Sequence, residues 1–337
     1  MRYELSDYEW TAIKPMLPNK PRGVRRVNDR RVLNGIFWVL RSGAPWRDLP
    51  EVYGPRTTCY NRFVRWRRAG VWDQIMDALA AGHDAAVQMI DTSVVRVHQH
   101  GACVADNNHQ DMGRSRGGLT SKIPAVVDTN GLPVHLALTP GEAHDNRLCS
   151  VLLSALLPQT MLLADRGYDA DWIRELARQQ GAWANIPPKR NRKDPICFSP
   201  YLYRARNLIE RFFNKIKQCR RVATRYDKLA ANYLAFVELA SIRVGLRANE
   251  SALTTSPLHK SSCSTHPDKG WLAVPSCIAK QGINEGGCSL LKLLAAVADL
   301  ASRLNVRFAP EAASRKSSKN DVCFSLRSGH PCQISHV

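Results

Sequence analysis

Two aspartates in the chain each follow a short run of residues that predicts a buried β-strand. Asp91 comes directly after Val-Gln-Met-Ile at residues 87–90, and Asp165 follows Met-Leu-Leu-Ala at residues 161–164. In α/β proteins, reactive groups collect at strand ends and on the helix packed beside them. A single aspartate at such a place is often only a turn cap, so a later acidic residue is needed to define a site.

Glu210 is the candidate for that third acidic residue. It lies in a stretch without glycine or proline, residues 202–228, which therefore predicts one long helix. At ~100° per residue, a polar row falls within an arc of roughly 60°: Tyr203, Arg206, Glu210 and Lys217. Apolar residues fill the neighbouring arc: Leu202, Ala205, Ile209, Phe212, Ile216 and Cys219. Burying them against a sheet would aim the polar row at the strand ends.

Three carboxylates brought together indicate a cation site. Without a cation they would repel and raise one another's pKa, and hard cations such as Mg²⁺ prefer carboxylate oxygen. Two such ions ~4 Å apart support the breaking and re-forming of phosphodiester bonds. Arg206 and Lys217 are suited to hold phosphates. The alternative for Glu210 is an ordinary helical pair with Arg206 or Asn214.

The charge of the chain favours a polyanionic partner. The 337 residues carry a formal net charge of +19, and nucleic acid is the commonest partner of such a chain. The alternative is that the charge serves only solubility. A basic run after Pro187-Pro188 predicts either a DNA contact or a solvated loop: Lys189, Arg190, Arg192 and Lys193.

Residues 1–84 predict a small all-helical unit. The capping box of Ser6 and Glu9 starts a helix at Asp7 that ends by Pro18, and further helices are expected over residues 29–42, 58–69 and 71–80. The third carries arginines beside Tyr60, Phe63 and Trp66: Arg62, Arg65, Arg67 and Arg68. This pattern suits a helix-turn-helix-like DNA-binding domain, although a helical bundle with a solvated basic face would look the same.

Residues 85–248 predict an α/β domain. A first strand continues through residues 93–97, and a hairpin with an Asn130-Gly131 turn joins residues 123–127 to 132–138. A helix over 146–156, a strand over 161–164, a helix over 170–180, a strand over 182–186 and the helix carrying Glu210 follow. This order is the ribonuclease H-like arrangement.

The motifs resemble those of the DDE transposases of bacterial insertion sequences, with the insertion sequence 5 type as the nearest group. The resemblance rests on Met-Ile-Asp91-Thr-Ser, on Leu-Ala-Asp165-Arg-Gly-Tyr-Asp, and on the Y-x2-R-x3-E-x6-K signature that contains Glu210. It also includes the Leu-Ser-Asp-x-Glu-Trp start and Gly-Ala-Pro-Trp-Arg-Asp-Leu-Pro at 43–50, and extends over residues 1–248.

The resemblance implies a function as well as a fold. It implies a Mg²⁺ or Mn²⁺ cofactor, binding to double-stranded DNA at terminal inverted repeats and at a target, strand cleavage by water and strand transfer by a 3′-hydroxyl. It also implies a homo-oligomer on the DNA. Two alternatives remain open: a DNA-binding regulator with an inactive nuclease core, and a host nuclease of the same fold.

The remaining features of the sequence exclude some classes of protein and add no further candidate site. The N-terminus does not look like a secretory signal and no apolar run spans a membrane, so a cytoplasmic protein is expected, associated with the nucleoid when bound to DNA. Ten scattered cysteines favour reduced thiols. Four histidines favour loop positions over a zinc site: His98, His100, His109 and His144. Residues 249–337 match no motif, and we expect a largely disordered, dispensable tail.

Overall fold

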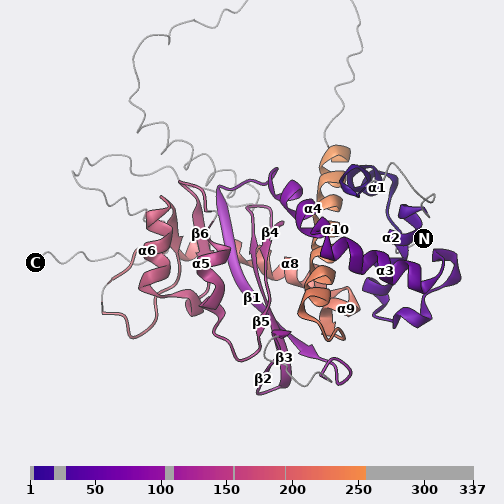
Figure 1. Cartoon of the computed structure of the whole chain (residues 1–337). Coiled ribbons are helices and arrows are strands. Elements are labelled where there is room, and N and C mark those ends of the chain that lie inside the picture. Colours follow the sequence, from indigo (N-terminus) through magenta and orange to yellow (C-terminus); the bar gives the residue numbers. More distant parts are fainter. Residues whose placement is uncertain (1–3, 19–27, 103–109, 155, 194, 256–337) are drawn as a thin grey trace, which may run out of the picture.

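The computed structural model describes residues 4–18, 28–102, 110–154, 156–193 and 195–255 (Figure 1). Its first part is helical, as predicted: α1 (Asp7–Ile13), α2 (Asp29–Ser42), α3 (Arg56–Arg68) and α4 (Val71–Ala80), with 3-10 turns at Lys14–Met16, Trp46–Asp48 and Glu51–Tyr53. Ser6 and Glu9 form the expected capping box. Asn28 caps α2 at its start, and Gly43 ends α2 at a φ of 73°. The predicted tail covers residues 249–337. Its residues 249–255 belong to the helix Ala230–Thr255, and residues 256–337 lie outside the described part.

The second part is a mixed β-sheet. Its main strands are β1 (Val87–Val97), β2 (Gly113–Ser115), β3 (Gly118–Val127), β4 (Pro133–Leu136), β6 (Met161–Ala164) and β7 (Trp183–Asn185), with short β5 (Thr139–Pro140) and β8 (Thr224–Arg225). β1 lies between antiparallel β3 and parallel β6, β7 adds to β6 in parallel, and β4 pairs with β3. Three antiparallel strands followed by two parallel ones confirm the ribonuclease H-like arrangement.

Both faces of the sheet are buried, and alternate residues along each strand serve different cores. Met89 and Leu163 pack into a core shared with α8 (Asn207–Lys217) and α10 (Ala230–Thr255). Ile90 belongs to a second core, which also contains residues of α5 (Cys149–Leu152) and α6 (Asp171–Gln179). Side chains alternate between faces along a strand, so each odd-numbered position near these strand ends faces α8.

Two predicted helices differ from the structure. The helix expected over 146–156 is only a 3-10 turn at Asp145–Leu148 followed by α5. The single helix expected over 202–228 is wrong. Instead the chain forms α7 (Pro200–Tyr203), a 3-10 turn at Arg204–Arg206, α8, α9 (Arg220–Ala223) and β8.

Tertiary contacts explain this break. Arg225 is fully buried and donates to Ser121 Oγ at 2.7 Å, while β8 pairs with β1. These contacts hold the backbone extended although no glycine or proline interrupts the sequence, because packing outweighs helix propensity.

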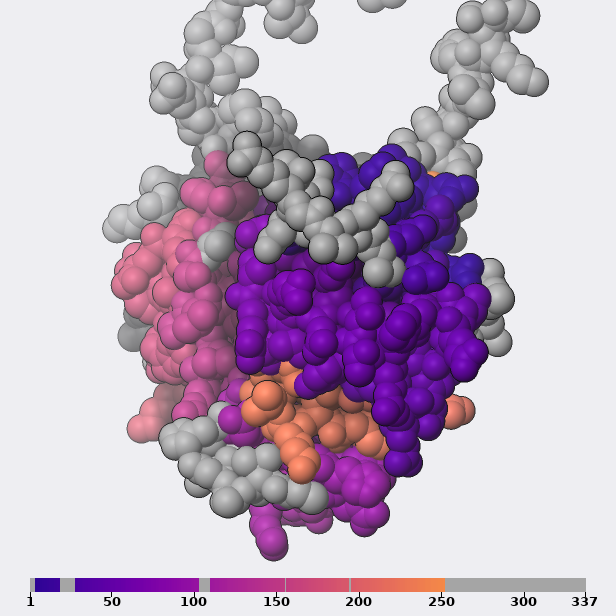
Figure 2. All heavy atoms as spheres, turned by 45° about the vertical axis from the view of Figure 1, so that its right-hand side comes forward, coloured from indigo at the N-terminus to yellow at the C-terminus, as the bar shows by residue number. Residues whose placement is uncertain are grey.

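The N-terminal helices and the sheet share one hydrophobic core through α10. Phe63 of α3 stacks on Phe236 of α10 with ring centroids 4.5 Å apart, and Trp46 contacts both rings. Arg221 of α9 donates to the Ala44 carbonyl at 3.1 Å. Figure 2 shows the α9–α10 segment, in orange, between the N-terminal helices and the β-hairpin region. The division into domains at residues 84 and 248 stays a prediction, and α10 continues beyond residue 248.

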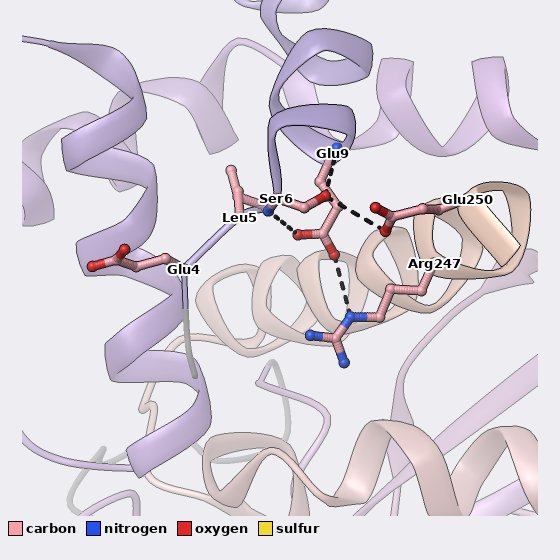
Figure 3. A pocket seen from close by; sticks show the side chains of 6 residues that line it. All are labelled: Glu4, Leu5, Ser6, Glu9, Arg247 and Glu250. Carbon is pink, nitrogen blue, oxygen red and sulfur yellow. Dashed lines mark hydrogen bonds and ion pairs between the residues drawn. The ribbon is translucent and has the colours of Figure 1, made fainter. Parts of the chain in front are cut away.

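A hollow at the start of α1 shows a second connection to α10 (Figure 3). The Glu9 side chain is 2% exposed and accepts from the backbone N–H of Ser6 at 2.9 Å, which completes the capping box. The same carboxylate pairs with Arg247 at 3.2 Å and Arg243 at 3.5 Å on α10. The residues that cap α1 therefore also attach it to α10. In the described part, no helix is both long and apolar enough to cross a bilayer.

Candidate active site

Asp91 of β1 and Asp165, the residue directly after β6, lie side by side at two neighbouring parallel strands. Ile90 of β1 pairs in register with Ala164 of β6, and each aspartate is the next residue. Both occupy odd-numbered positions, so the alternation of the strands directs them to the face covered by α8. The backbone N–H of Thr92 donates to Asp91 Oδ1 at 2.8 Å, and that of Gly167 donates to Asp165 Oδ1 at 2.8 Å. Each carboxylate is thereby held by its own chain.

The surroundings of Asp91 act on its pKa in opposite directions. Burial raises it most, and the nearby charge of Asp165 raises it further, while the Thr92 N–H and Arg206 lower it. The net direction is a raised pKa. A carboxylate that is partly buried beside a second carboxylate gains free energy from a neighbouring cation.

Glu210 lies on α8, whose apolar face packs against the sheet as predicted through the buried Ile209, Phe212 and Ile216. One guanidinium joins Glu210 to Asp91. Arg206 Nη1 donates to Asp91 Oδ2 at 2.7 Å, and Nη2 donates to Glu210 Oε1. The structure therefore brings Glu210 to the same place as the aspartates, with a cationic side chain between them.

Tyr203 and Lys217 complete the predicted row at either end. The Tyr203 ring centroid lies 5.7 Å from the guanidinium carbon of Arg206. Lys217 Nζ donates to the Val94 carbonyl of β1 at 3.0 Å, and burial lowers the pKa of this lysine. The polar row therefore faces β1, although it is divided among α7, the 3-10 turn at Arg204–Arg206 and α8.

The donor set fits a hard cation, since all three candidate ligands are carboxylates. In the described ranges, however, no three His, Cys, Asp or Glu side chains gather closely enough to form a metal-binding group. Arg206 lies between Asp91 and Glu210 and pairs with both. Metal binding by the three carboxylates stays a prediction.

Other side chains that could bind a metal make contacts away from these carboxylates. Asp128 Oδ1 accepts from the backbone N–H of Asn130 at 2.9 Å and of Leu132 at 2.7 Å, so this carboxylate stabilises the hairpin turn. The rings of His98 and His100 lie 4.9 Å apart, without a metal-binding group in the part of the chain described. His109 lies outside the described residues.

Sequence reasoning missed three residues that support the site: Thr92, Tyr168 and Asp169. Tyr168 is 1% exposed, and its hydroxyl lies 2.8 Å from the Thr92 hydroxyl, directly beside Asp91 in the chain. Burial raises the pKa of Tyr168 strongly. Both residues occur in the quoted motifs, so their position was available from the sequence, but the contact depends on how β1 and the turn after β6 lie together.

Asp169 also supports the site, through the loop that follows β7. It is 3% exposed and accepts from Arg174, Arg192 and the backbone N–H of Lys189. Burial alone would raise its pKa, but these hydrogen bonds lower the pKa to about 2. The ionised Asp169 therefore fixes the basic loop after β7 next to the turn that holds Asp165.

The predicted DNA-binding residues differ in accessibility. Arg65, Arg68, Lys189 and Arg190 are exposed. Arg62 is held inside the helical part, where it pairs with Asp29 and lies over the Trp66 ring at 5.2 Å. Contacts of any of these residues with DNA stay predictions.

The fold and the carboxylates together define a ribonuclease H-like protein of the DDE class, and comparison with known proteins gives the family. Residues 5–76 match the model described as "Putative transposase of IS4/5 family", and residues 82–244 match "Transposase DDE domain". The chain is 39% identical over 130 residues to a putative transposase for insertion sequence element IS6501 of Brucella ovis, covering 38% of this chain and 100% of that protein.

The chain belongs to the DDE transposases of bacterial insertion sequences. This membership implies a divalent metal cofactor. A second relative, an uncharacterized protein of Sinorhizobium fredii, is 40% identical over 100 residues, which are 29% of this chain and 80% of the relative. A piggyBac transposase synaptic complex with hairpin DNA shares 8% identity and a TM-score of 0.43 over 91% of this chain and 79% of that one. At that score the likeness supports no conclusion about function.

Proposed function

We propose that this transposase binds the terminal inverted repeats of its own mobile element and catalyses Mg²⁺- or Mn²⁺-dependent DNA strand cleavage and strand transfer. The observation that carries the proposal is the double contact of Arg206, which joins Asp91 of β1 to Glu210 of α8 while Asp165 lies beside Asp91. Asp91 and Asp165 follow register-paired residues, and Arg206 contacts both Asp91 and Glu210.

Asp91, Asp165 and Glu210 would hold the metal ions. When bound, such ions supply a nucleophile at neutral pH and neutralise charge on the phosphodiester and the leaving oxygen. The protein's own part is to hold Asp91 and Asp165 through the Thr92 and Gly167 backbone N–H groups, and Glu210 through Arg206. Because the aspartates are fixed by backbone contacts, the site is organised before substrate arrives.

Basic side chains would bind the DNA partner. Arg206, which contacts Asp91 and Glu210, and Lys217, which binds the Val94 carbonyl of the same strand as Asp91, would contact the phosphate being cut, and the Tyr203 ring lies beside Arg206. Lys189 and Arg190 extend from the loop that Asp169 holds beside the site. Arg65 and Arg68 on α3 would contact the DNA backbone farther along the terminal repeat, and a homo-oligomer would bring two ends together.

The proposal is tested by cleavage of a duplex oligonucleotide that carries the inverted repeat flanking the gene. With Mg²⁺, the wild type should cut at the element end, and Asp165→Asn should bind the oligonucleotide without cutting it. Glu175→Gln is the matched control, because Glu175 is a carboxylate of α6 that pairs only with its helical neighbours. Equal cutting by Asp165→Asn, or no difference between repeat and random DNA, would contradict the proposal.

A further inference from the structure

We propose that Arg206 is an internal counter-cation that holds the catalytic carboxylates together before metal arrives, and that metal entry releases its guanidinium for a DNA phosphate. This inference rests on the proposed function. It assigns Arg206 two successive partners instead of a permanent phosphate contact. In this role Arg206 is a positioning residue that competes with the metal for the same oxygens.

The two arms of the guanidinium show the bridging role. Nη1 donates to Asp91 Oδ2 at 2.7 Å, while Nη2 donates to Glu210 Oε1. Asp91 lies on β1 and Glu210 on α8, and 119 positions separate them in the sequence, so the pair is brought together by tertiary structure. A planar guanidinium is suited to hold two carboxylates at once, which a lysine ammonium does less specifically.

Burial makes the bridge energetically relevant. The side chains of Arg206 and Asp91 are 16% and 18% exposed, whereas Glu210 is 52% exposed. An ion pair that is largely shielded from water is worth more than an exposed pair, and breaking it on one side leaves a poorly solvated charge. Asp91 Oδ1 already accepts from the Thr92 N–H, so Oδ2 is the oxygen that Arg206 covers.

Arg206 covers one oxygen of each carboxylate that would hold the metal, Asp91 Oδ2 and Glu210 Oε1. A cation that binds either of these two oxygens would compete with the arm of Arg206 that donates to it. A guanidinium arm released in this way would be available to donate to a DNA phosphate. By linkage, DNA that holds Arg206 also strengthens metal binding.

The direction in which the Mn²⁺ affinity changes distinguishes this role from a purely structural one. We expect Arg206→Gln to bind Mn²⁺ more tightly than the wild type in the absence of DNA, by ~tenfold, which corresponds to ~1.4 kcal/mol of lost competition. If Arg206 only maintained the shape of the site, the same variant would bind Mn²⁺ more weakly. Electron paramagnetic resonance of free Mn²⁺ during a titration gives the affinity without any need for activity.

A charge-matched variant controls for the general effect of removing one positive charge. Arg211→Gln makes the same change one residue after Glu210, at an exposed position. We expect it to change the Mn²⁺ affinity less than threefold, since distant exposed charges interact weakly. An equal increase in Mn²⁺ affinity in Arg206→Gln and Arg211→Gln would overturn the proposal. A folded Arg206→Gln variant that binds Mn²⁺ more weakly than the wild type would overturn it as well.

Asp91→Asn distinguishes failure of this inference from failure of the proposed function. If the wild type binds no Mn²⁺ that depends on Asp91, the metal site itself is wrong. If Asp91→Asn abolishes binding while Arg206→Gln equals the wild type, the site stands and the competition is wrong. On the unsubstituted protein, ¹⁵N-arginine NMR supplies a second test: the Arg206 Nε–H signal, assigned with Arg206→Lys, should shift on Mg²⁺ addition, and an unchanged signal contradicts the proposal.

Discussion

Asp91 and Asp165 occupy equivalent positions on two neighbouring parallel strands, because Ile90 pairs in register with Ala164. This register places two carboxylates side by side on the face that α8 covers. Parallel strands that are linked through a crossover cannot slip by one residue without turning every side chain to the other face. The sheet therefore fixes the spacing of the two aspartates, and α8 brings Glu210 to them through Arg206.

The buried carboxylate of Glu9 should contribute strongly to stability. Glu9→Gln keeps the side-chain acceptor of the capping box but removes the charge that pairs with Arg243 and Arg247. We expect a loss of about 3 kcal/mol in the free energy of unfolding, because the largely buried Arg243 keeps its bond to the Glu4 carbonyl but loses the opposite charge of Glu9. Urea denaturation measures it. Asp7→Asn is the control, because the Asp7 side chain is 93% exposed. If this variant loses more than ~1 kcal/mol of unfolding free energy, burial does not explain the effect of Glu9→Gln.

Gly43 should be harder to replace than other glycines with positive φ. A Cβ at Gly43 would lie 2.9 Å from the Cβ of Arg220, and φ is 73°. Gly118 has a φ of 98° but nothing within 4 Å of its Cβ position. Gly118→Ala should cost ~1–2 kcal/mol of backbone strain, and Gly43→Ala should cost ~1–3 kcal/mol more through overpacking. Equal melting temperatures for the two variants would show that the α2–α9 contact adjusts freely.

Glu238 should make stability fall with rising pH. Burial, with Asp73 beside it, raises the pKa of Glu238 from 4.5 to about 8. The folded state therefore holds a proton that the unfolded chain has released, and stability decreases between pH 4.5 and about 8 by up to ~1.4 kcal/mol per pH unit, then levels off. The difference in unfolding free energy between Glu238→Gln and the wild type should follow this window. A difference independent of pH would mean that Glu238 titrates normally.

Much of the fold is predictable because local signals determine it. The Ser6–Glu9 capping box, the Asn28 and Gly43 caps of α2 and the Asn-Gly hairpin turn each depend on residues close together in the sequence. The long helix over 202–228 was wrong because its interruption depends on Arg225, which is buried against Ser121 of β3. No local pattern reveals that contact.

The site was predictable in part for the same reason. The row of Arg206, Glu210 and Lys217 follows from helical spacing, and its approach to β1 was inferred from the apolar stripe beside it. The bridge from Arg206 to Asp91, the support of Thr92 by Tyr168 and the burial of Arg62 all depend on side-chain positions across elements. Spacing in the sequence predicts which face of a helix a residue occupies, but it does not predict which side chain on another element that residue contacts.

The segment after residue 255 is expected to be dispensable for DNA binding and cleavage. A chain that ends at Thr255 retains α10, which packs on the N-terminal helices and completes the common core. It should melt at the temperature of the full chain and cut the terminal-repeat oligonucleotide at a similar rate. A truncated protein that folds but does not cut would show that the tail takes part in catalysis.

The central claim is that Asp91, Asp165 and Glu210 act as one metal-dependent centre. Single-turnover cleavage of the terminal-repeat oligonucleotide with Mg²⁺ tests it in four variants: Asp91→Asn, Asp165→Asn, Glu210→Gln and the triple substitution. Residues that act as a unit are not additive, so each single variant should lose at least ~10³-fold in rate and the triple variant should be no slower than the slowest single one. Substantial cutting by any single variant, or losses that multiply in the triple variant, would contradict the claim.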